Sequence, residues 1–186
     1  MNPLRVALFI DGGNLYQRLR DAGVPKRTRF DYSALVTLLL RNRRLISKTY
    51  YVGIVRNHDH TTKSQAMVEG QQKFLGKLEA EGFTIKRGRI VYDHKIREKG
   101  VDVQIAIDLI VGAIEDQYDV AMVVSSDTDL IPAIRYVRGR GKVVEYVGFS
   151  AKPSLGMARE STMSILLLPE DLERFIQKSE PGPEAA

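Results

Sequence analysis

The segment Val120–Ile134 reads VAMVVSSDTDLIPAI and carries the strongest indication of the fold in this chain. Its first five residues, Val120–Val124, are apolar and rich in β-branched side chains, which is typical of a short, fully buried strand. Apolar residues then recur at helical spacing at four positions, namely Leu130, Ile131, Ile134 and Val137. The segment therefore predicts a buried strand, a short turn and a helix, the repeating unit of an α/β sheet.

Two carboxylates lie at the junction between this strand and this helix. Asp127 and Asp129 should leave the carboxyl end of the strand and enter the first turn of the helix. Ligands of open α/β sheets bind at that edge, so the pair indicates a cation site. The alternative is helix capping, because Ser126 and Asp129 have the spacing of a capping-box variant and acidic residues favour helix amino ends.

A second acid occupies a matching place near the start of the chain. The apolar run Leu4–Ile10 (LRVALFI) predicts a buried strand that ends at Asp11, and two glycines then lead into a helix. Asp11 could serve only the turn, and Asn14 could be a simple helix cap. The functional interpretation is that Asp11 binds a metal and that the Asn14 amide orients this carboxylate or a metal-bound water.

A third acid, Asp102, lies in the first turn of a helix that should open at Lys99–Val103 (KGVDV) and run to about Glu115. Capping is again the alternative. Asp108 follows six positions later, about 240° around the helix, so it does not share a face with Asp102. We therefore leave Asp108 outside the ligand set, as either a buried acceptor or an exposed residue.

The remaining apolar runs alternate with helical patterns along the whole chain. Strands are expected at Thr49–Val55, from Phe83, at Lys142–Val147 and at Met163–Leu168, with a short hairpin within residues 86–97. This alternation predicts an α/β fold with a mostly parallel sheet covered by helices on both faces. We expect one domain over residues 1–178 and a disordered tail over residues 179–186, whose composition is SEPGPEAA.

Composition narrows the functional classes. The 186 residues include 28 Lys and Arg against 23 Asp and Glu, a net charge of +5, and no cysteine. Thiolate metal sites and disulfides are thereby excluded, and a reducing, cytoplasmic setting is expected. No apolar run is long enough to predict a membrane span. A basic chain that gathers aspartates in one place suggests a polyanionic partner held through metal ions.

The metal expected from these ligands is a hard one. His58 and His60 could bind a transition metal, but alternate positions of a loop favour a solvated segment. Without cysteine or a convincing histidine, the carboxylates form an oxygen-only set, which favours Mg²⁺ or Mn²⁺ over Zn²⁺. In the metal-free protein the clustered carboxylates should repel one another, so at least one pKa should be raised.

Three of these segments together resemble a known family. Phe9–Tyr16 (FIDGGNLY), Lys99–Ile110 (KGVDVQIAIDLI) and Ser125–Ile134 (SSDTDLIPAI) resemble the three motifs of the NYN domain family, which includes the LabA-like proteins and belongs to the PIN-like ribonuclease superfamily. The similarity extends from Leu4 to about Ile176. It implies a PIN-like three-layer α/β/α sandwich with strand order 3-2-1-4-5.

The resemblance also implies an activity: metal-dependent hydrolysis of RNA phosphodiester bonds, with single-stranded or structured RNA as the partner. By motif position the metal site would comprise Asp11, Asp102, Asp127 and Asp129, supported by Asn14. The substrate contacts would be Lys99, Ser126 and Thr128.

Two other functional classes compete with the nuclease. A haloacid-dehalogenase-type phosphatase would need a second Asp where this chain has Gly13, so that class fits poorly. A non-catalytic RNA-binding or regulatory module that keeps the fold and the metal site remains the stronger alternative. The oligomeric state stays open between a monomer and a homodimer.

Overall fold

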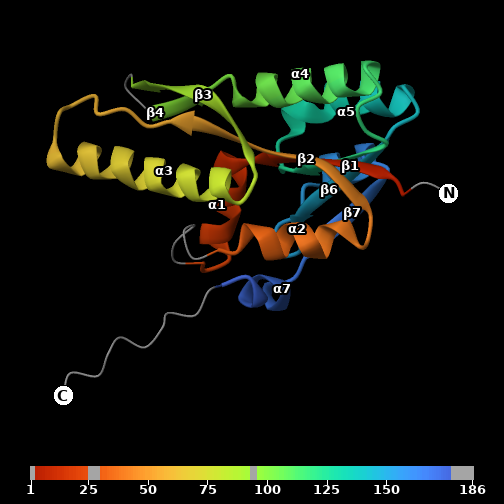
Figure 1. Ribbon diagram of the computed structural model, residues 1–186, viewed down its shortest axis with the longest axis horizontal. Coiled ribbons are helices and arrows are strands. Elements are labelled where there is room, and N and C mark those ends of the chain that lie inside the picture. The colour runs from red at the N-terminus through yellow and green to blue at the C-terminus, as the bar shows by residue number, and fades with distance from the viewer. Residues whose placement is uncertain (1–2, 25–29, 93–95, 177–186) are drawn as a thin grey trace.

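The computed structural model describes residues 3–24, 30–92 and 96–176, where strands alternate with helices as predicted (Figure 1). In these ranges the strands are β1 (Arg5–Asp11), β2 (Arg44–Ile54), β3 (Thr84–Tyr92), β4 (Ile96–Lys99), β5 (Val120–Val124), β6 (Val143–Phe149) and β7 (Met163–Leu167). The helices are α1 (Gly12–Asp21), α2 (Tyr32–Leu40), α3 (Thr62–Ala80), α4 (Val101–Ile114), the 3₁₀ helix η2 (Thr128–Leu130), α5 (Ile131–Gly139), α6 (Leu155–Glu160) and α7 (Pro169–Arg174). The expected tail over residues 179–186 lies outside the described ranges.

The described strands form one sheet in the order β4-β3-β2-β1-β5-β6-β7. Every neighbouring pair is parallel except β3–β4, an antiparallel pair that corresponds to the hairpin expected within residues 86–97 but extends to Lys99. The predicted order 3-2-1-4-5 is confirmed by β3-β2-β1-β5-β6, and β7 extends the sheet by one further parallel strand. The strand order reverses between β1 and β5, which is where ligands of open α/β sheets bind.

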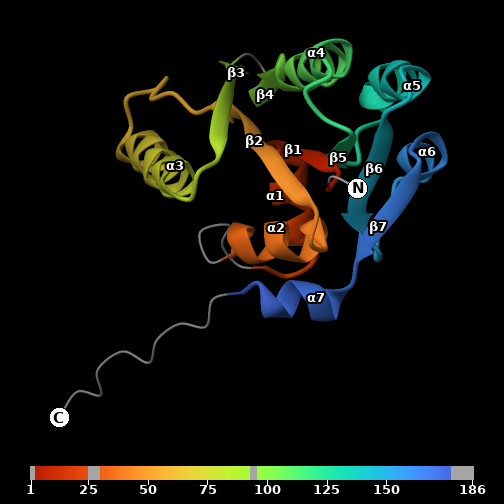
Figure 2. The same cartoon turned by 45° about the vertical axis from the view of Figure 1, so that its right-hand side comes forward.

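Helices cover both faces of the sheet, so the predicted three-layer α/β/α sandwich is confirmed (Figure 2). Alternate residues of β1 enter two separate cores because successive side chains of a strand point to opposite faces. Leu8 and Ile10 pack with α1, α2, α3 and α7, whereas Ala7 and Phe9 pack with α4, α5 and α6. None of the helices in the described ranges is long and apolar enough to cross a membrane.

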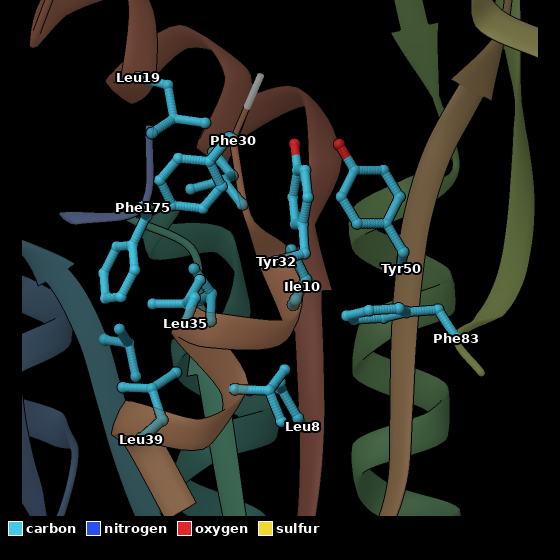
Figure 3. Packing of buried hydrophobic residues seen from close by; sticks show 14 of the residues in the cluster. Leu8, Ile10, Leu19, Phe30, Tyr32, Leu35, Leu39, Tyr50, Phe83 and Phe175 are labelled. Carbon is cyan, nitrogen blue, oxygen red and sulfur yellow. The ribbon is translucent and has the colours of Figure 1, made fainter. Parts of the chain in front are cut away.

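Aromatic side chains pack together in the core that contains Leu8 and Ile10, beside the carboxyl ends of β1 and β2 (Figure 3). The Tyr32 ring of α2 meets the rings of Phe30 and Tyr50 edge-on, at centroid distances of 5.1 and 5.8 Å. A Cβ atom at Gly12 would lie 2.6 Å from Cζ of Tyr50 and 2.7 Å from the Tyr51 carbonyl oxygen. Gly12 therefore lets α1 begin directly against β2, immediately after Asp11.

Two ion pairs stabilise the amino-terminal edge of the sheet, opposite the edge at which β1 and β5 end. Arg43 donates to both carboxylate oxygens of the buried Glu145 in β6, at 2.6 and 3.1 Å. Arg5 similarly donates to Asp119, just before β5, through Nε at 3.1 Å and Nη2 at 2.8 Å. The bond network lowers the pKa of Asp119 to about 2, chiefly through the Arg5 side chain.

The structure corrects several predicted boundaries. β2 begins at Arg44 rather than Thr49, because its mostly exposed first half also pairs with β1 but lacks the continuous apolar run by which a strand is recognised in sequence. The helix expected directly after β5 is preceded by the 3₁₀ turn η2, and α5 begins only at Ile131. Asp127, not Ser126, caps that turn by accepting the backbone N–H of Asp129.

Candidate active site

Asp11 is the last residue of β1 and also the N-cap of α1. Its Oδ1 accepts the backbone N–H of Asn14 at 3.0 Å, and its Oδ2 accepts the hydroxyl of Ser125 at 2.9 Å. The residue is only 8% exposed. Both carboxylate oxygens are therefore held in place, one by α1 and one by the residue that follows β5.

Burial raises the pKa of the Asp11 carboxyl group. The neighbouring Asp127 carboxylate raises it further, while the bonds from Asn14 and Ser125 lower it. The sequence predicted a raised pKa from mutual repulsion of the acids. The direction agrees for Asp11, but loss of hydration is the larger cause.

Ser125 is a site residue that sequence reasoning missed. Its hydroxyl group donates to Asp11 and also accepts the backbone N–H of Asp127 at 3.1 Å. It is 2% exposed, and one buried hydroxyl thus joins acids carried by β1 and by the segment after β5. The available signal was its place as the first polar residue after the buried strand.

Asn14 and Ser126 supply a second link between the same two segments. The side-chain Oδ1 of Asn14 accepts the backbone N–H of Ser126 at 3.0 Å. Asn14 lies in the first turn of α1 and is not its cap, since Asp11 has that role. The expected support from Asn14 acts on the loop that carries Asp127.

Asp102 approaches from the third segment, in the first turn of α4. Gly100, at φ +82°, precedes the helix in a left-handed conformation that favours glycine. At Gly88 of β3 a Cβ atom would lie 2.5 Å from Cγ2 of Val101, so α4 begins in close contact with the sheet. This contact places the half-buried Asp102 near the carboxyl ends of the strands.

A cavity of about 240 Å³ lies where these three segments meet, lined by Asp11, Gly13, Asn14, Val101, Asp102 and Asp127. Three of the four predicted ligands and Asn14 thus border one space. Asp129 does not belong to this lining: it is exposed, and its backbone N–H bonds back to Asp127 at 2.9 Å.

The donor set around the cavity fits a hard cation by chemistry, because it consists of carboxylate and amide oxygens. As placed, the side chains surround the cavity without closing on a single point. Within the described ranges, no group of three or more His, Asp or Glu residues is close enough to hold a metal ion.

The residues expected to contact substrate differ in accessibility. Lys99, at the end of β4, and Thr128, in η2, are exposed. Ser126 is half-buried, and its hydroxyl lies 3.5 Å from Oη of Tyr146. His58 and His60 are exposed in the connection between β2 and α3.

Asp108 belongs to a different cluster. Its carboxylate accepts hydrogen bonds from Oη of Tyr51 at 2.8 Å, Nζ of Lys86 at 2.8 Å and Nε2 of Gln104 at 3.1 Å. These contacts join α4 to β2 and β3 on the side of the helix away from Asp102. The sequence left open whether Asp108 is a buried acceptor or an exposed residue. The structure shows that it is a hydrogen-bond acceptor and that it is partly buried.

Comparison with known proteins finds a matching family and a similar solved structure. The NYN domain family matches residues 5–166. No curated protein matches the chain significantly. A crystal structure of a protein of unknown function from Vibrio parahaemolyticus is 21% identical, with a TM-score of 0.69 over 89% of this chain and 94% of its own. At that identity the likeness supports the fold alone.

Proposed function

The chain belongs to the NYN domain family, and from this premise we propose that it is a metal-dependent ribonuclease acting at the cavity between β1, β5 and α4. The NYN family is part of the PIN-like nuclease superfamily, which suggests cleavage of RNA. One observation carries the assignment to this cavity: Asp11, Asp102 and Asp127, from segments far apart in the sequence, line the same space.

In this proposal Asp11, Asp102 and Asp127 hold Mg²⁺ or Mn²⁺, and Asp129 is the weakest of the expected ligands because it lies outside the cavity lining. When bound, such an ion neutralises the phosphate, lowers the pKa of a coordinated water and stabilises the leaving oxygen.

The protein's own contribution is preorganisation. Ser125 and the Asn14 backbone fix the Asp11 carboxylate, and the Asn14 side chain fixes the loop before Asp127. These contacts hold Asp11 and the loop before Asp127 in place before metal or substrate binds, which reduces the rearrangement needed at these two positions. We expect the exposed Lys99 and Thr128, together with the half-buried Ser126, to contact the substrate.

The test is cleavage of a labelled single-stranded RNA with Mn²⁺, with Mg²⁺ and with EDTA. EDTA should abolish cleavage and added Mn²⁺ should restore it in the native protein but not in Asp11→Asn or Asp127→Asn. Asp21→Asn, an exposed acid at the end of α1, is the matched control and should cleave normally. Equal cleavage in EDTA would refute metal dependence.

Asp129→Asn decides whether the fourth expected ligand takes part. If this variant cleaves like Asp21→Asn, the metal site consists of the three cavity acids. If it loses activity like Asp127→Asn, the exposed 3₁₀ turn must move when metal binds.

The alternative is a non-catalytic RNA-binding or regulatory module that keeps the fold and the metal site. Binding separates the two functions, because phosphate contacts by Lys and Arg dominate affinity and make it salt-dependent. Asp127→Asn should bind RNA about as well as the native protein while failing to cleave it. Salt-dependent binding without cleavage, with either metal, would establish the RNA-binding module instead.

A further inference from the structure

Helix α4 is apolar on the side that faces solvent as well as on the side that faces the core. Its buried residues include Val101, Ile105 and Leu109. The outward side chains are also β-branched aliphatics with large exposed fractions: Val103 58%, Ile107 49%, Val111 40% and Ile114 52%. We call these four residues the outer stripe.

The outer stripe is a continuous surface and not a scatter of exposed residues. At 100° per residue, its four members fall within an arc of roughly 80°, opposite the buried residues of α4. A helix that is apolar all round is normally covered on all sides. The stripe exposes on the order of 400 Å² of apolar surface, the size of the largest apolar patch on a typical soluble monomer, and such a patch is often functional.

We propose that the outer stripe is the interface with a second copy of this chain, with the two α4 helices packed antiparallel. The order of residues along the stripe is Val, Ile, Val, Ile, at spacings of four, four and three. About a two-fold axis near the middle of the helix, Val103 meets Ile114 of the second copy and Ile107 meets its Val111. Each valine therefore faces an isoleucine, which is the self-complementarity that a two-fold interface requires.

Three physical features favour this occupant. The four stripe positions carry no charge, so pairing them leaves no stripe charge buried. Antiparallel packing sets the positive amino end of one helix beside the negative carboxyl end of the other. An interface of standard size buries about 800 Å² per protomer, of which about 65% is apolar in homodimers, so the stripe supplies most of the apolar part.

The arrangement has a consequence for the candidate active site. Asp102 directly precedes the stripe, and antiparallel packing places the two Asp102 residues at opposite ends of the helix pair, about 20 Å apart along the axis. Each cavity would then be complete within its own protomer. The proposal does not depend on the proposed nuclease function.

Sedimentation equilibrium over a dilution series tests the assembly. The native chain should be a dimer, and Ile107→Glu should raise its dissociation constant about 100-fold or more because a charge would be buried at the centre of the interface. Met163→Glu is the matched control, since Met163 in β7 is 51% exposed and lies on another surface. A native protein that stays monomeric, or a dimer broken only by Met163→Glu, would overturn the proposal.

Cross-linking tests the geometry and does not depend on the glutamate variant remaining folded. The chain has no cysteine, so single cysteines report without background. A mixture of Val103→Cys and Ile114→Cys should form a disulfide-linked dimer, whereas Val103→Cys alone should not. Cross-linking of Val103→Cys to itself would show parallel helices, and absence of any cross-link would place the interface elsewhere; either result refutes the antiparallel stripe.

Discussion

Removing the Ser125 hydroxyl should destabilise the protein more than any other single-oxygen deletion in the candidate site. The hydroxyl makes a 2.9 Å bond to the buried Asp11 carboxylate and a 3.1 Å bond from the backbone of Asp127. A hydrogen bond to a charged group contributes about 1.5–3 kcal/mol and a neutral one about 1 kcal/mol. Ser125→Ala should therefore lower the free energy of unfolding by about 2–4 kcal/mol.

The neighbouring serine is a closely matched control. The Ser126 hydroxyl has one marginal contact, at 3.5 Å from Oη of Tyr146, so Ser126→Ala should cost less than about 0.5 kcal/mol. Urea denaturation at neutral pH measures both changes. In an Asp11→Ala background the charged bond is already absent, so Ser125→Ala should then cost only about 1 kcal/mol.

Two outcomes would refute this reasoning. If Ser125→Ala and Ser126→Ala destabilise equally, the hydroxyl bridge between β1 and the segment after β5 contributes nothing specific. If the cost of Ser125→Ala is unchanged in the Asp11→Ala background, the effect arises from packing and not from the bond to Asp11.

Three further expectations concern the scaffold. Arg43→Met should lower the thermal midpoint and cost about 3–5 kcal/mol, because it leaves the buried Glu145 carboxylate without its ion-pair partner; Glu145→Gln in the same background should recover part of the loss. Gly12→Ala should cost about 1–3 kcal/mol through overlap with β2, whereas Gly70→Ala, in an open position of α3, should be neutral or stabilising in the same urea titration. The pKa of Asp119 is lowered to about 2, so its contribution to stability is present above about pH 4 and is lost as pH falls towards 2. The thermal midpoints of the native protein and of Asp119→Asn should therefore differ at pH 6 and converge near pH 2. A difference that stays constant with pH would contradict this linkage.

Sequence patterns located the elements of the site but not their arrangement. Asp11 and Asp127 were each placed after a buried apolar run, and the structure puts both at the carboxyl edge of adjacent strands. The spacing of Asp127 and Asp129 could not show that only Asp127 lines the cavity, because the same residues can begin a regular helix or a 3₁₀ turn. The turn that forms leaves Asp129 exposed and outside the cavity.

The Ser125 bridge was invisible for a different reason. A serine after a strand is consistent with a turn, a cap or a buried hydrogen bond, and only the position of β1 beside β5 decides between them. That neighbourhood brings Ser125 within 2.9 Å of a residue 114 positions away in the chain. Local sequence carries no information on a contact of that separation.

The sequence by itself determined the α/β class, the order of strands and helices, and the acids that end them, because hydrophobic periodicity and strand-end chemistry are local properties of the chain. Tertiary structure alone decided which carboxylates share a cavity, which hydroxyl joins them, and that the outer face of α4 is exposed. Each of these depends on packing between distant segments: β1 against β5, α4 against Gly88 of β3, and the core burying only one face of an apolar helix.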